Sequence, residues 1–585
     1  MVSRWILCFS FVCFYPWRRL GEDGIEHKIK NRFHFIMIKP SHYDDDGYVI
    51  QWLRSSIPSN TLSVLNGLAM DCADRQVLGE GTAIELLTFD ETNIRIDIAG
   101  LSKKIQESGG QGLIALVGVQ SNQFPRAVDI ARQFRKQGIQ VCIGGFHVSG
   151  CLAMLPKITP DLQEALDLDI SLFAGEVEGR LESFFQDAFA KKMKPLYNYM
   201  DDLPNIEGVP VPYLPLSMVK RTSGTRTSFD AGRGCPFLCS FCTIINVQGH
   251  KSRYRSADDV EDIVRSGIAE GILNFFISDD DFARNRLWEA IFDRLIALRK
   301  NEGLKIRLII QVDTMCHKIP RFIEKAGQAG VTRVFIGLES INPEALKGAK
   351  KKQNRFEEYR SMLDAWHAAG VLTYAGYILG FPTDTPESIL EDIKTIQREL
   401  PIDLLEFFIL TPLPGSEDHK VLYEQGVAMD QDMNNYDVVH VTTAHAKMSA
   451  QEWLGIYHQA WEAYYTPEHV ETVIRRARTW GFDTAEMMQK LLHFSACPKI
   501  EKVHPLEGGL LRLKYRKDRR YGMRLENPLV FYPGYLFETL SKLIRFGALY
   551  FRFKRILNRV NKSTPALPAA APMDPSLVVI SSRNG

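Results

Sequence analysis

Short apolar runs alternate with amphipathic stretches through the first third of the chain, which predicts a series of strand–helix units. The predicted strands are 33–38, 84–89, 112–119, 141–143 and 170–174, with helical stretches after residue 60 and over 127–138. Strands that alternate with helices form parallel sheets whose ligands collect at the carboxyl ends of the strands. The pattern therefore predicts a doubly wound, Rossmann-like α/β domain over 33–200.

A second series of strand–helix units begins near residue 220. Its predicted strands are 226–231, 274–278, 305–312, 332–338, 372–379 and 404–410, with helices at 257–270, 287–300, 319–330, 356–370 and 386–400. Six units are fewer than the eight of a complete TIM barrel, so the pattern predicts a partial (β/α)6 barrel over 220–430. The proline-rich stretch 201–219 is the predicted linker between the two domains.

The two ends of the chain have different patterns. Helical stretches at 450–465 and 466–480 predict a mainly helical C-terminal region over 431–562. Residues 1–32 are expected to be an N-terminal extension, because their apolar run is shorter than the roughly 20 residues of a membrane span and no small-x-small cleavage site follows it. The Pro/Ala-rich tail 563–585 is expected to be disordered.

Composition adds limits to this picture. Hydrophobic residues make up 45% of the chain and charged residues 24%, as in soluble globular proteins. A net charge of +1 gives no global attraction to nucleic acid or membranes. Ten cysteines are too sparse for a disulfide framework, and a thiolate cluster belongs in a reducing compartment, which predicts a cytoplasmic protein.

Positive charge is nevertheless concentrated near the C-terminus. Residues 512–562 contain 14 Lys or Arg but only three acids. Within them, leucines and aromatics of 536–560 are interleaved with basic residues, which is typical of a helix lying on an anionic membrane surface. A helix packed on the enzyme with a solvated basic face is the second interpretation, and nucleic acid is the least favoured partner.

Three cysteines follow the strand predicted at 226–231. Cys235, Cys239 and Cys242 form a Cys-x3-Cys-x2-Cys array, with Phe241 before the last one. Thiolates at this spacing can share one soft metal centre. Structural zinc takes four protein ligands, and no fourth Cys or suitable His stands nearby. Three thiolates with one open position suit a 4Fe–4S cluster, with zinc as the alternative.

The array resembles the signature of the radical S-adenosylmethionine (SAM) superfamily. The resemblance implies that Cys235, Cys239 and Cys242 ligate a 4Fe–4S cluster and that SAM chelates the open iron. An electron from a donor such as flavodoxin or ferredoxin then splits SAM into methionine and a 5′-deoxyadenosyl radical. The family has a six-unit open barrel, in agreement with the predicted strand count.

Polar residues close several predicted barrel strands, where parallel barrels keep their chemistry. By resemblance, Asp279 and Asp280 are expected to contact the SAM amino group, and Glu339 with Ser340 its ribose or carboxylate. Helix capping is the competing role for these residues. The other members of the predicted cofactor-contacting set are Phe241, Gln311, Asp313 and Gly376. Of these, Gly376 is expected to leave room for adenine or the backbone.

The first domain resembles the cobalamin-binding domain that precedes the barrel in one branch of this superfamily. That branch has Gly-Gly-x-His and Gly-Glu-x-Glu turns, matched here by 144–147 and 175–178. The expected cobalamin contacts are Gly144, Gly145, His147, Gly175 and Glu176. The Asp-x-His-x-x-Gly element that supplies an axial His in some cobalamin proteins is absent, which implies cobalt without a protein imidazole. A domain that binds no cofactor is the alternative.

These features predict a radical SAM enzyme, with cobalamin-dependent methyl transfer to an unactivated carbon as the leading hypothesis. Radical rearrangement, oxidation or cyclisation without cobalamin is the enzymatic alternative. A tRNA methylthiotransferase would need a second cysteine set, which the scattered cysteines do not provide. A cobalamin- or redox-sensing binding module is the alternative from another class. The substrate stays open among lipids, tetrapyrroles, peptides and small metabolites, with the basic segment favouring a lipid or membrane-associated one.

Overall fold

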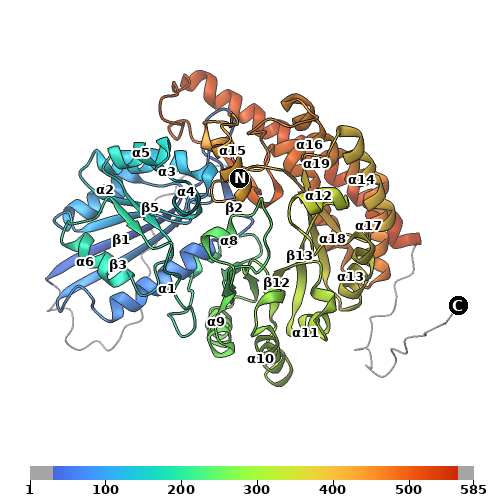
Figure 1. The fold of residues 1–585 in the computed structure, drawn as a ribbon, viewed down its shortest axis with the longest axis horizontal. Helices are drawn as coiled ribbons and strands as arrows, with labels where there is room; N and C mark the ends of the chain where they lie inside the picture. Colours follow the sequence, from blue (N-terminus) through green and yellow to red (C-terminus); the bar gives the residue numbers. More distant parts are fainter. Residues whose placement is uncertain (1–29, 564–585) are drawn as a thin grey trace, which may run out of the picture.

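Two parallel sheets lie side by side, and a helical C-terminal region extends across both (Figure 1). The structure, a computed structural model, describes residues 30–563. Most of the predicted extension 1–32 and nearly all of the predicted tail 563–585 lie outside the described residues. Asn31 and Arg32 already belong to the first strand. Within residues 30–563, no helix is both long enough and apolar enough to cross a membrane.

The first sheet has six parallel strands in the order β3-β1-β4-β5-β6-β7. Their bounds are β1 Asn31–Lys39, β3 Thr82–Asp90, β4 Gly112–Leu116, β5 Gln140–Gly144, β6 Ser171–Ala174 and β7 Leu196–Asn198. One face is covered by α1 (Asn60–Asp74) and α6 (Leu181–Phe189), and the other by α2 (Ile98–Glu107), α3 (Phe124–Arg135) and α5 (Pro160–Asp167). Helices on both faces explain why these strands read as continuous apolar runs. The predicted doubly wound fold is confirmed.

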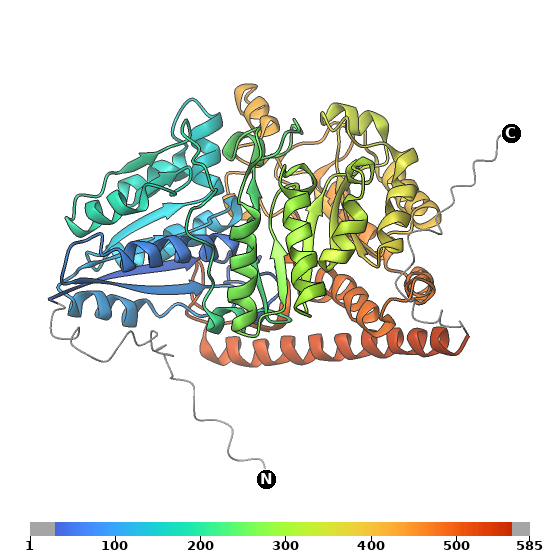
Figure 2. The same ribbon diagram turned by 90° about the horizontal axis from the view of Figure 1, so that it is seen from below.

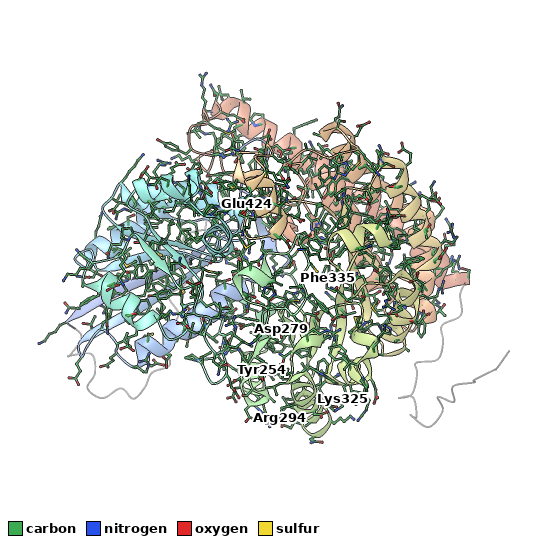
Figure 3. The ribbon with its side chains drawn as sticks, viewed as in Figure 1. Tyr254, Asp279, Arg294, Lys325, Phe335 and Glu424 are labelled. Atoms are coloured by element: carbon green, nitrogen blue, oxygen red, sulfur yellow. The ribbon has the colours of Figure 1, made fainter. Side chains whose placement is uncertain are left out.

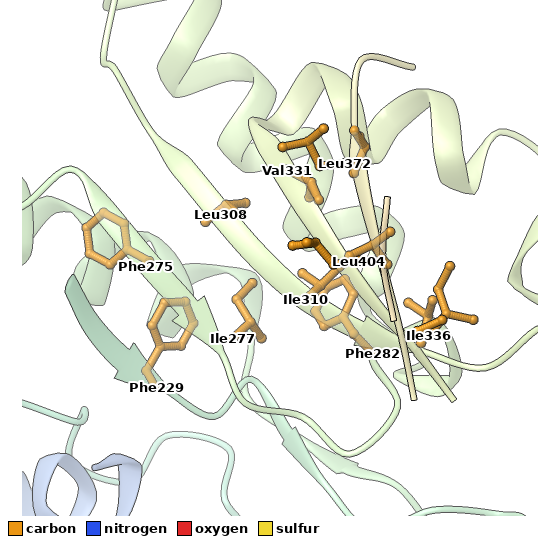
Figure 4. Close-up of a cluster of buried hydrophobic side chains, with 14 of the residues drawn as sticks. Phe229, Phe275, Ile277, Phe282, Leu308, Ile310, Val331, Ile336, Leu372 and Leu404 are labelled. Carbon is orange, nitrogen blue, oxygen red and sulfur yellow. The ribbon is translucent and has the colours of Figure 1, made fainter. Parts of the chain in front are cut away.

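The second sheet is also parallel, in the order β8-β11-β12-β13-β14-β15. Its strands are β8 Arg226–Phe229, β11 Asn274–Ile277, β12 Arg307–Val312, β13 Val331–Glu339, β14 Leu372–Leu379 and β15 Leu404–Ile409. The crossover helices are α9 (Ala257–Ala269), α10 (Trp288–Asn301), α11 (Phe322–Ala329), α13 (Phe356–Ala368) and α14 (Pro386–Glu399). Figure 4 shows the apolar cluster that anchors these units. Because β8 and β15 do not pair with each other, the barrel is open, as predicted.

Both open edges of the barrel are covered by other parts of the chain. Helix α1 packs against β8, and the Ser228 hydroxyl donates to the Pro58 carbonyl at 3.3 Å. Helices α16 (Ala450–Tyr464) and α18 (Thr484–Ala496) pack against β15. An uncovered edge strand would present unpaired backbone groups to other chains. The first domain therefore protects one edge of the barrel, and the C-terminal region protects the other.

Two segments are packed more closely than their composition predicts. In the segment 201–219, Ile206 and Leu214 are buried, and the buried Arg255 donates to the carbonyl of Ile206 at 3.5 Å. An antiparallel pair that the sequence does not predict joins β2 (Gln51–Ser55) to β16 (Gly509–Leu513). The C-terminal region is thereby attached to the first domain as well as to the barrel.

The C-terminal basic segment contains one long helix, α19 (Pro528–Ser563), which runs along one side of the molecule (Figure 2). The predicted membrane segment 536–560 lies inside it and divides into two parts. Phe553, Ile556, Leu557 and Val560 are buried against α17 (Pro467–Thr479) and α18. The packed-helix interpretation therefore describes the second part, whereas the apolar side chains of the first part point outward.

Candidate active site

The cysteine loop leaves the carboxyl end of β8 and returns to the place where it started. Its ends are joined by the antiparallel pair of β9 (Gly232–Arg233) with β10 (Arg253–Tyr254). Between them, Gly234 has a φ of 88°, and a Cβ there would lie 2.7 Å from the carbonyl oxygen of Lys251. Only glycine meets both conditions without strain. The sequence Arg-Gly-Cys thus fixes the point at which the thiols leave the barrel.

The three cysteines lie close enough together to affect one another electrostatically. Cys239 is buried, and Cys235 and Cys242 are half-buried. Burial raises the pKa of Cys235 and of Cys242 to about 12, so a metal centre is needed to hold them as thiolates. Within residues 30–563, no three acidic, Cys or His side chains converge as ligands of a single ion. Three cysteines leave one position of a 4Fe–4S cluster open, whereas structural zinc takes four protein ligands.

A segment after α12 (Pro343–Gly348) surrounds the middle cysteine. The amide of Ser240 donates to the carbonyl of Ala349 at 3.1 Å, and the Gln353 amide nitrogen lies 3.8 Å from the Cys239 sulfur. The buried Lys351 ammonium pairs with Glu339 and lies 5.8 Å from the centre of the Phe241 ring. Burial lowers the pKa of Lys351, but the Glu339 carboxylate outweighs that effect, so the pKa is raised overall. A permanent cation therefore stands beside the thiols.

Glu339 occupies a strained backbone position at the end of β13. Its φ is 63°, in the left-handed region, and the pairing of β13 with β14 shifts register between Gly337 and Glu339. Non-glycine residues in this conformation are costly and concentrate at functional sites. The next residue, Ser340, is buried, and its hydroxyl accepts from the Asn342 amide at 3.0 Å. The helix that follows is capped by Asn342, so capping is not the role of Ser340.

The two predicted aspartates at the end of β11 differ in what they contact. Asp279 is buried (Figure 3), and one carboxylate oxygen accepts from the amides of Ala231 and Gly232 at 2.7 Å each. Its other oxygen accepts from Asn285 at 3.1 Å. Asp279 therefore holds the start of the cysteine loop instead of facing a ligand. Asp280 is half-buried, and burial raises its pKa to about 7, although a hydrogen bond from the Gly234 amide lowers it.

The structure also shows what surrounds three other residues that were predicted to contact a cofactor, namely Asp313, Gly376 and Gln311. The carboxylate of Asp313 is held by Arg284, with one nitrogen–oxygen distance of 2.8 Å, and is not open to a cofactor. The expected space at Gly376 is filled, because a Cβ there would lie 3.0 Å from the Phe335 ring. Phe335 lies in the barrel interior (Figure 3). Gln311 remains half-buried and donates to the Asp279 carbonyl at 3.1 Å, which links two strand ends.

A cavity of about 180 Å³ opens in the first domain, between the sheet and the helices α1 and α6. Its inner walls are apolar and include Phe35, Ala115, Phe173 and Phe184. At its mouth lie the carboxyl ends of β4, β5 and β6, with the predicted residues Gly144, Gly145, Gly175 and Glu176. Among the described residues, Asn60 and Glu178 line it with a buried oxygen that lacks a hydrogen-bond partner. A ligand with polar donors would satisfy them.

The glycines at the mouth of the cavity are required by neighbouring backbone. Gly145 has a φ of 154°, and a Cβ there would lie 2.2 Å from the Val119 nitrogen. Gly175 has a φ of 96°, and its Cβ would lie 3.0 Å from the backbone of Tyr199. The Gly175 amide donates to the hydroxyl of Ser149 at 3.1 Å. These contacts bring the ends of β4, β5, β6 and β7 close together and shape the mouth.

His147, one of the predicted cobalamin contacts, is not among the residues that line the cavity. It lies in α4 (Phe146–Met154) and is buried, and its ring packs tilted against Phe124 at 4.4 Å between ring centres. Its Nε2 lies 2.5 Å from a carboxylate oxygen of Asp161, and its Nδ1 lies 3.1 Å from the Ser121 hydroxyl. Although burial lowers the pKa of His147, Asp161 and Cys151 raise it to about 10 overall. Its role in this structure is to anchor α4.

Arg233, two residues before the first cysteine, connects the cavity to the cysteine loop. Its buried guanidinium pairs with Glu176 and Glu178 of the first domain and with Asp230 of the barrel, each at 2.6 Å. A second cation, Arg253, pairs with Glu176 at 2.5 Å. Buried charges are stable only when paired in this way. The mouth of the cavity and the base of the loop therefore form one ionic network.

Several residues of this site gave no signal in the sequence. Lys351 stands in the middle of a run of three lysines, which reads as a solvated turn. Gln353 lies in a polar turn between two helices, Asn60 is the first residue of α1, and Ser149 lies inside an apolar helix. Only the fold brings them to the cysteines or to the cavity. Arg233 had one available signal, its place next to the Gly-Cys turn.

Comparison with known proteins agrees with this geometry. Residues 231–396 match the sequence profile of the radical SAM superfamily. The bacteriochlorophyllide d C-12(1)-methyltransferase of Chlorobaculum tepidum is 26% identical over 358 residues, which cover 60% of this chain and 74% of that protein. The hopanoid C-2 methylase of Rhodopseudomonas palustris is 26% identical over 297 residues, which cover 49% of this chain and 53% of that protein.

A solved structure shares the two-domain fold. The radical SAM methyltransferase TsrM from Kitasatospora setae, with cobalamin and a [4Fe–4S] cluster bound, has a TM-score of 0.53 at 15% identity and covers 78% of this chain and 99% of that chain. At this identity the likeness concerns the fold. The family profile, the six-stranded open barrel and the position of the cysteine loop agree on a radical SAM domain over residues 231–396.

Proposed function

We propose that this protein is a cobalamin-dependent radical SAM enzyme that transfers a methyl group to an unactivated carbon atom. One observation carries the proposal: the mouth of the cavity in the first domain and the base of the cysteine loop share Arg233. A second cofactor held at that mouth would face the chemistry of the barrel. The similar methyltransferase of Chlorobaculum tepidum and the fold of TsrM support this assignment.

The donor set supports a cluster with SAM on the barrel side. Cys235, Cys239 and Cys242 would hold the cluster, and Asp280 and Glu339 would face SAM. When bound, the cluster supplies the electron for reductive cleavage of SAM. The chain's own residues contribute position and charge. Lys351 places a buried cation beside the thiols, and Asp279 fixes the loop through two backbone amides.

The cavity fits one part of cobalamin. Its apolar walls between the sheet and α1 suit a planar apolar group of the cofactor, and its mouth opens at the strand ends. The unpartnered oxygens of Asn60 and Glu178 would accept from amide or hydroxyl groups. When bound, cobalamin supplies a transferable methyl group. Because His147 is held by Asp161, the first domain would provide no imidazole ligand from that turn.

The chemistry needs two partners besides the cofactors. A radical SAM enzyme requires a reductant, for which flavodoxin or ferredoxin is our proposal, and a substrate. The cytoplasm is the compartment proposed, because it keeps cluster thiolates reduced. Peripheral contact with a membrane surface also belongs to this proposal, since the exposed part of α19 is apolar and flanked by cations.

The decisive experiment uses the full-length protein with its cluster reconstituted under anaerobic conditions. Hydroxocobalamin is added, excess is removed by desalting, and the absorbance of retained cobalamin is recorded. The protein is then reduced and mixed with SAM carrying a deuterated methyl group and with extracts of cells that lack the protein. We expect retained cobalamin, 5′-deoxyadenosine and a product that carries the three deuterons.

Two results would redirect the proposal in different ways. 5′-Deoxyadenosine without retained cobalamin would favour radical rearrangement, oxidation or cyclisation. Retained cobalamin without SAM cleavage would favour a sensing module. Absence of both would remove the enzymatic assignment.

A further inference from the structure

The first part of α19 presents an apolar surface to the outside along the helix. Leu529, Leu536, Phe537, Leu540, Ile544 and Phe551 form the outer stripe, and each is at least half exposed. Their spacings of three, four and seven residues place them on one side of the helix. At 1.5 Å per residue the stripe is roughly 33 Å long. Soluble monomers rarely expose so continuous an apolar surface without a partner.

The inner side of the same helix is fixed to the protein by ion pairs. Lys542 pairs with Glu501 at 2.9 Å and with Glu538 at 2.7 Å, and Lys514 pairs with Glu538 at 3.2 Å. Tyr535 donates to the Arg512 carbonyl at 3.1 Å. The helix is therefore held in place with its apolar side outward.

Free cations stand at both ends of the outer stripe. Lys517 and Arg524 precede it, and Arg552, Arg555 and Lys562 follow it. None of these five has an ion-pair partner within residues 30–563. Apolar side chains between cations are the pattern of a helix lying in the plane of an anionic bilayer, where the side chains enter the acyl boundary and the cations meet headgroups.

Charge argues against a second copy of this chain as the occupant. Residues 512–562 carry 14 Lys or Arg and three acids, so two such segments in contact would repel each other. An anionic lipid surface has the complementary charge. Tyr521, Met523 and Leu525, which are exposed in the approach to the helix, widen the apolar surface beyond the stripe.

We propose that the outer stripe of α19 docks the enzyme on the surface of a membrane that contains anionic lipids. Figure 2 shows the helix running along one side of the molecule, so the whole stripe can meet a flat surface at once. Docking of this kind needs neither SAM nor electron transfer. It therefore stands apart from the proposed chemistry and fails or holds separately.

The test measures binding of the full-length holoenzyme to vesicles by flotation, without SAM or reductant. Vesicles of phosphatidylcholine with phosphatidylglycerol are compared with vesicles of phosphatidylcholine alone. We expect the wild type to bind the anionic vesicles, and Phe537→Ser/Ile544→Ser to bind at least about tenfold more weakly. Leu529→Ser/Leu536→Ser should weaken binding similarly, which guards against a folding defect in either variant. Arg552→Gln/Arg555→Gln should reduce the preference for anionic vesicles.

The matched control is Ile158→Ser/Val421→Ser, which removes two exposed apolar side chains of other surfaces and should bind like the wild type. Two results would overturn the proposal. One is that the wild type does not float with anionic vesicles, or that all variants float as well as the wild type. The other is a stable dimer in solution that dissociates in Phe537→Ser/Ile544→Ser, since a second copy would then be the occupant.

Discussion

The two sheets of this protein are built alike but use their faces differently. Each has six parallel strands with helical crossovers. The first sheet is covered by apolar helices on both faces, so a ligand can enter only at its carboxyl edge and in the cavity beside α1. The barrel sheet has one apolar face, and its other face carries polar and aromatic residues. The same topology thus leaves the carboxyl edge of the sheet open for a ligand in the first domain, and it encloses an interior in the barrel.

The interior face of the barrel contains groups that a doubly covered sheet would not tolerate. Glu406 of β15 is buried, and neither of its oxygens has a hydrogen-bond partner among the described residues. Burial raises the pKa of Glu406 to about 8, so it is mostly neutral at pH 7. His504 from the C-terminal region lies 3.9 Å away and stacks on Phe408 at 4.6 Å. The central strand β4 of the first sheet, in contrast, carries only apolar side chains from Leu113 to Leu116, and all four are buried.

The largest expected effect tests the edge of the barrel. Replacing Cys239 by Ala should remove the cluster iron and reduce SAM cleavage to background, because a three-thiolate site has no spare ligand. Iron content and 5′-deoxyadenosine report the result. Cys151→Ala should retain both, since that thiol is buried in the apolar core of the first domain. Retained cleavage in Cys239→Ala would overturn the assignment of the cluster site.

The second prediction tests the junction between the sheets. Arg233→Met would leave Asp230, Glu176 and Glu178 buried with too little positive charge, which costs about 3–5 kcal/mol of unfolding free energy. Chemical denaturation measures this loss. Arg294→Met, on the outer side of α10 (Figure 3), should cost less than about 1 kcal/mol because its ion pairs are exposed.

The pH dependence of this loss has a defined sign. Burial raises the pKa of Asp230, but Arg233 and Arg255 outweigh it, so the folded pKa lies below its ordinary value. A carboxyl group of this kind stabilises the fold above its unfolded pKa, near 4, and the contribution disappears as the pH falls through the folded pKa. The difference between wild type and Arg233→Met should therefore be largest at neutral pH and shrink on acidification. A difference that stays constant from pH 7 down to about pH 2 would contradict the ionic account.

The third prediction concerns the edge of the first sheet. Gly145→Ala would place a Cβ 2.2 Å from the Val119 nitrogen and should destabilise the protein by about 2–4 kcal/mol, with loss of cobalamin retention. Gly138→Ala is the matched control, because its φ is also positive at 71° but nothing lies within 4 Å. It should cost only about 1 kcal/mol. Equal losses would mean that φ alone, and not the close strand ends, requires glycine at 145.

The smallest expected effect tests whether the cavity contributes to cobalamin binding. Asn60→Ala removes an unpartnered oxygen and should weaken cobalamin binding about fivefold, the equivalent of about 1 kcal/mol, without changing stability. Titration of the reconstituted protein with hydroxocobalamin measures the change. Gln106→Ala on the exposed side of α2 should bind as the wild type does. Unchanged binding in Asn60→Ala would separate the cavity from the cofactor.

The sequence by itself determined five of the six strands of the first sheet, all six strands of the barrel and the position of the cysteine array. Apolar runs bounded by Gly, Pro and Asp are local signals, so strands such as 372–379 were predicted at the bounds that the structure has. Glycines that face backbone, such as Gly145, also leave a local signal. The direction in which a side chain points does not. His147 and Gly376 were predicted to face cofactors, but Asp161 holds the first and phenyl rings fill the space at the second.

Only the tertiary structure decided which residues meet across long stretches of chain. The pairing of β2 with β16 and the network of Arg233 depend on how the two domains pack, which no local pattern encodes. The same holds for α19, whose composition is mixed along its length. Packing against α17 and α18 buries its second part and leaves the outer stripe exposed, because a helix can bury only the side that a partner covers.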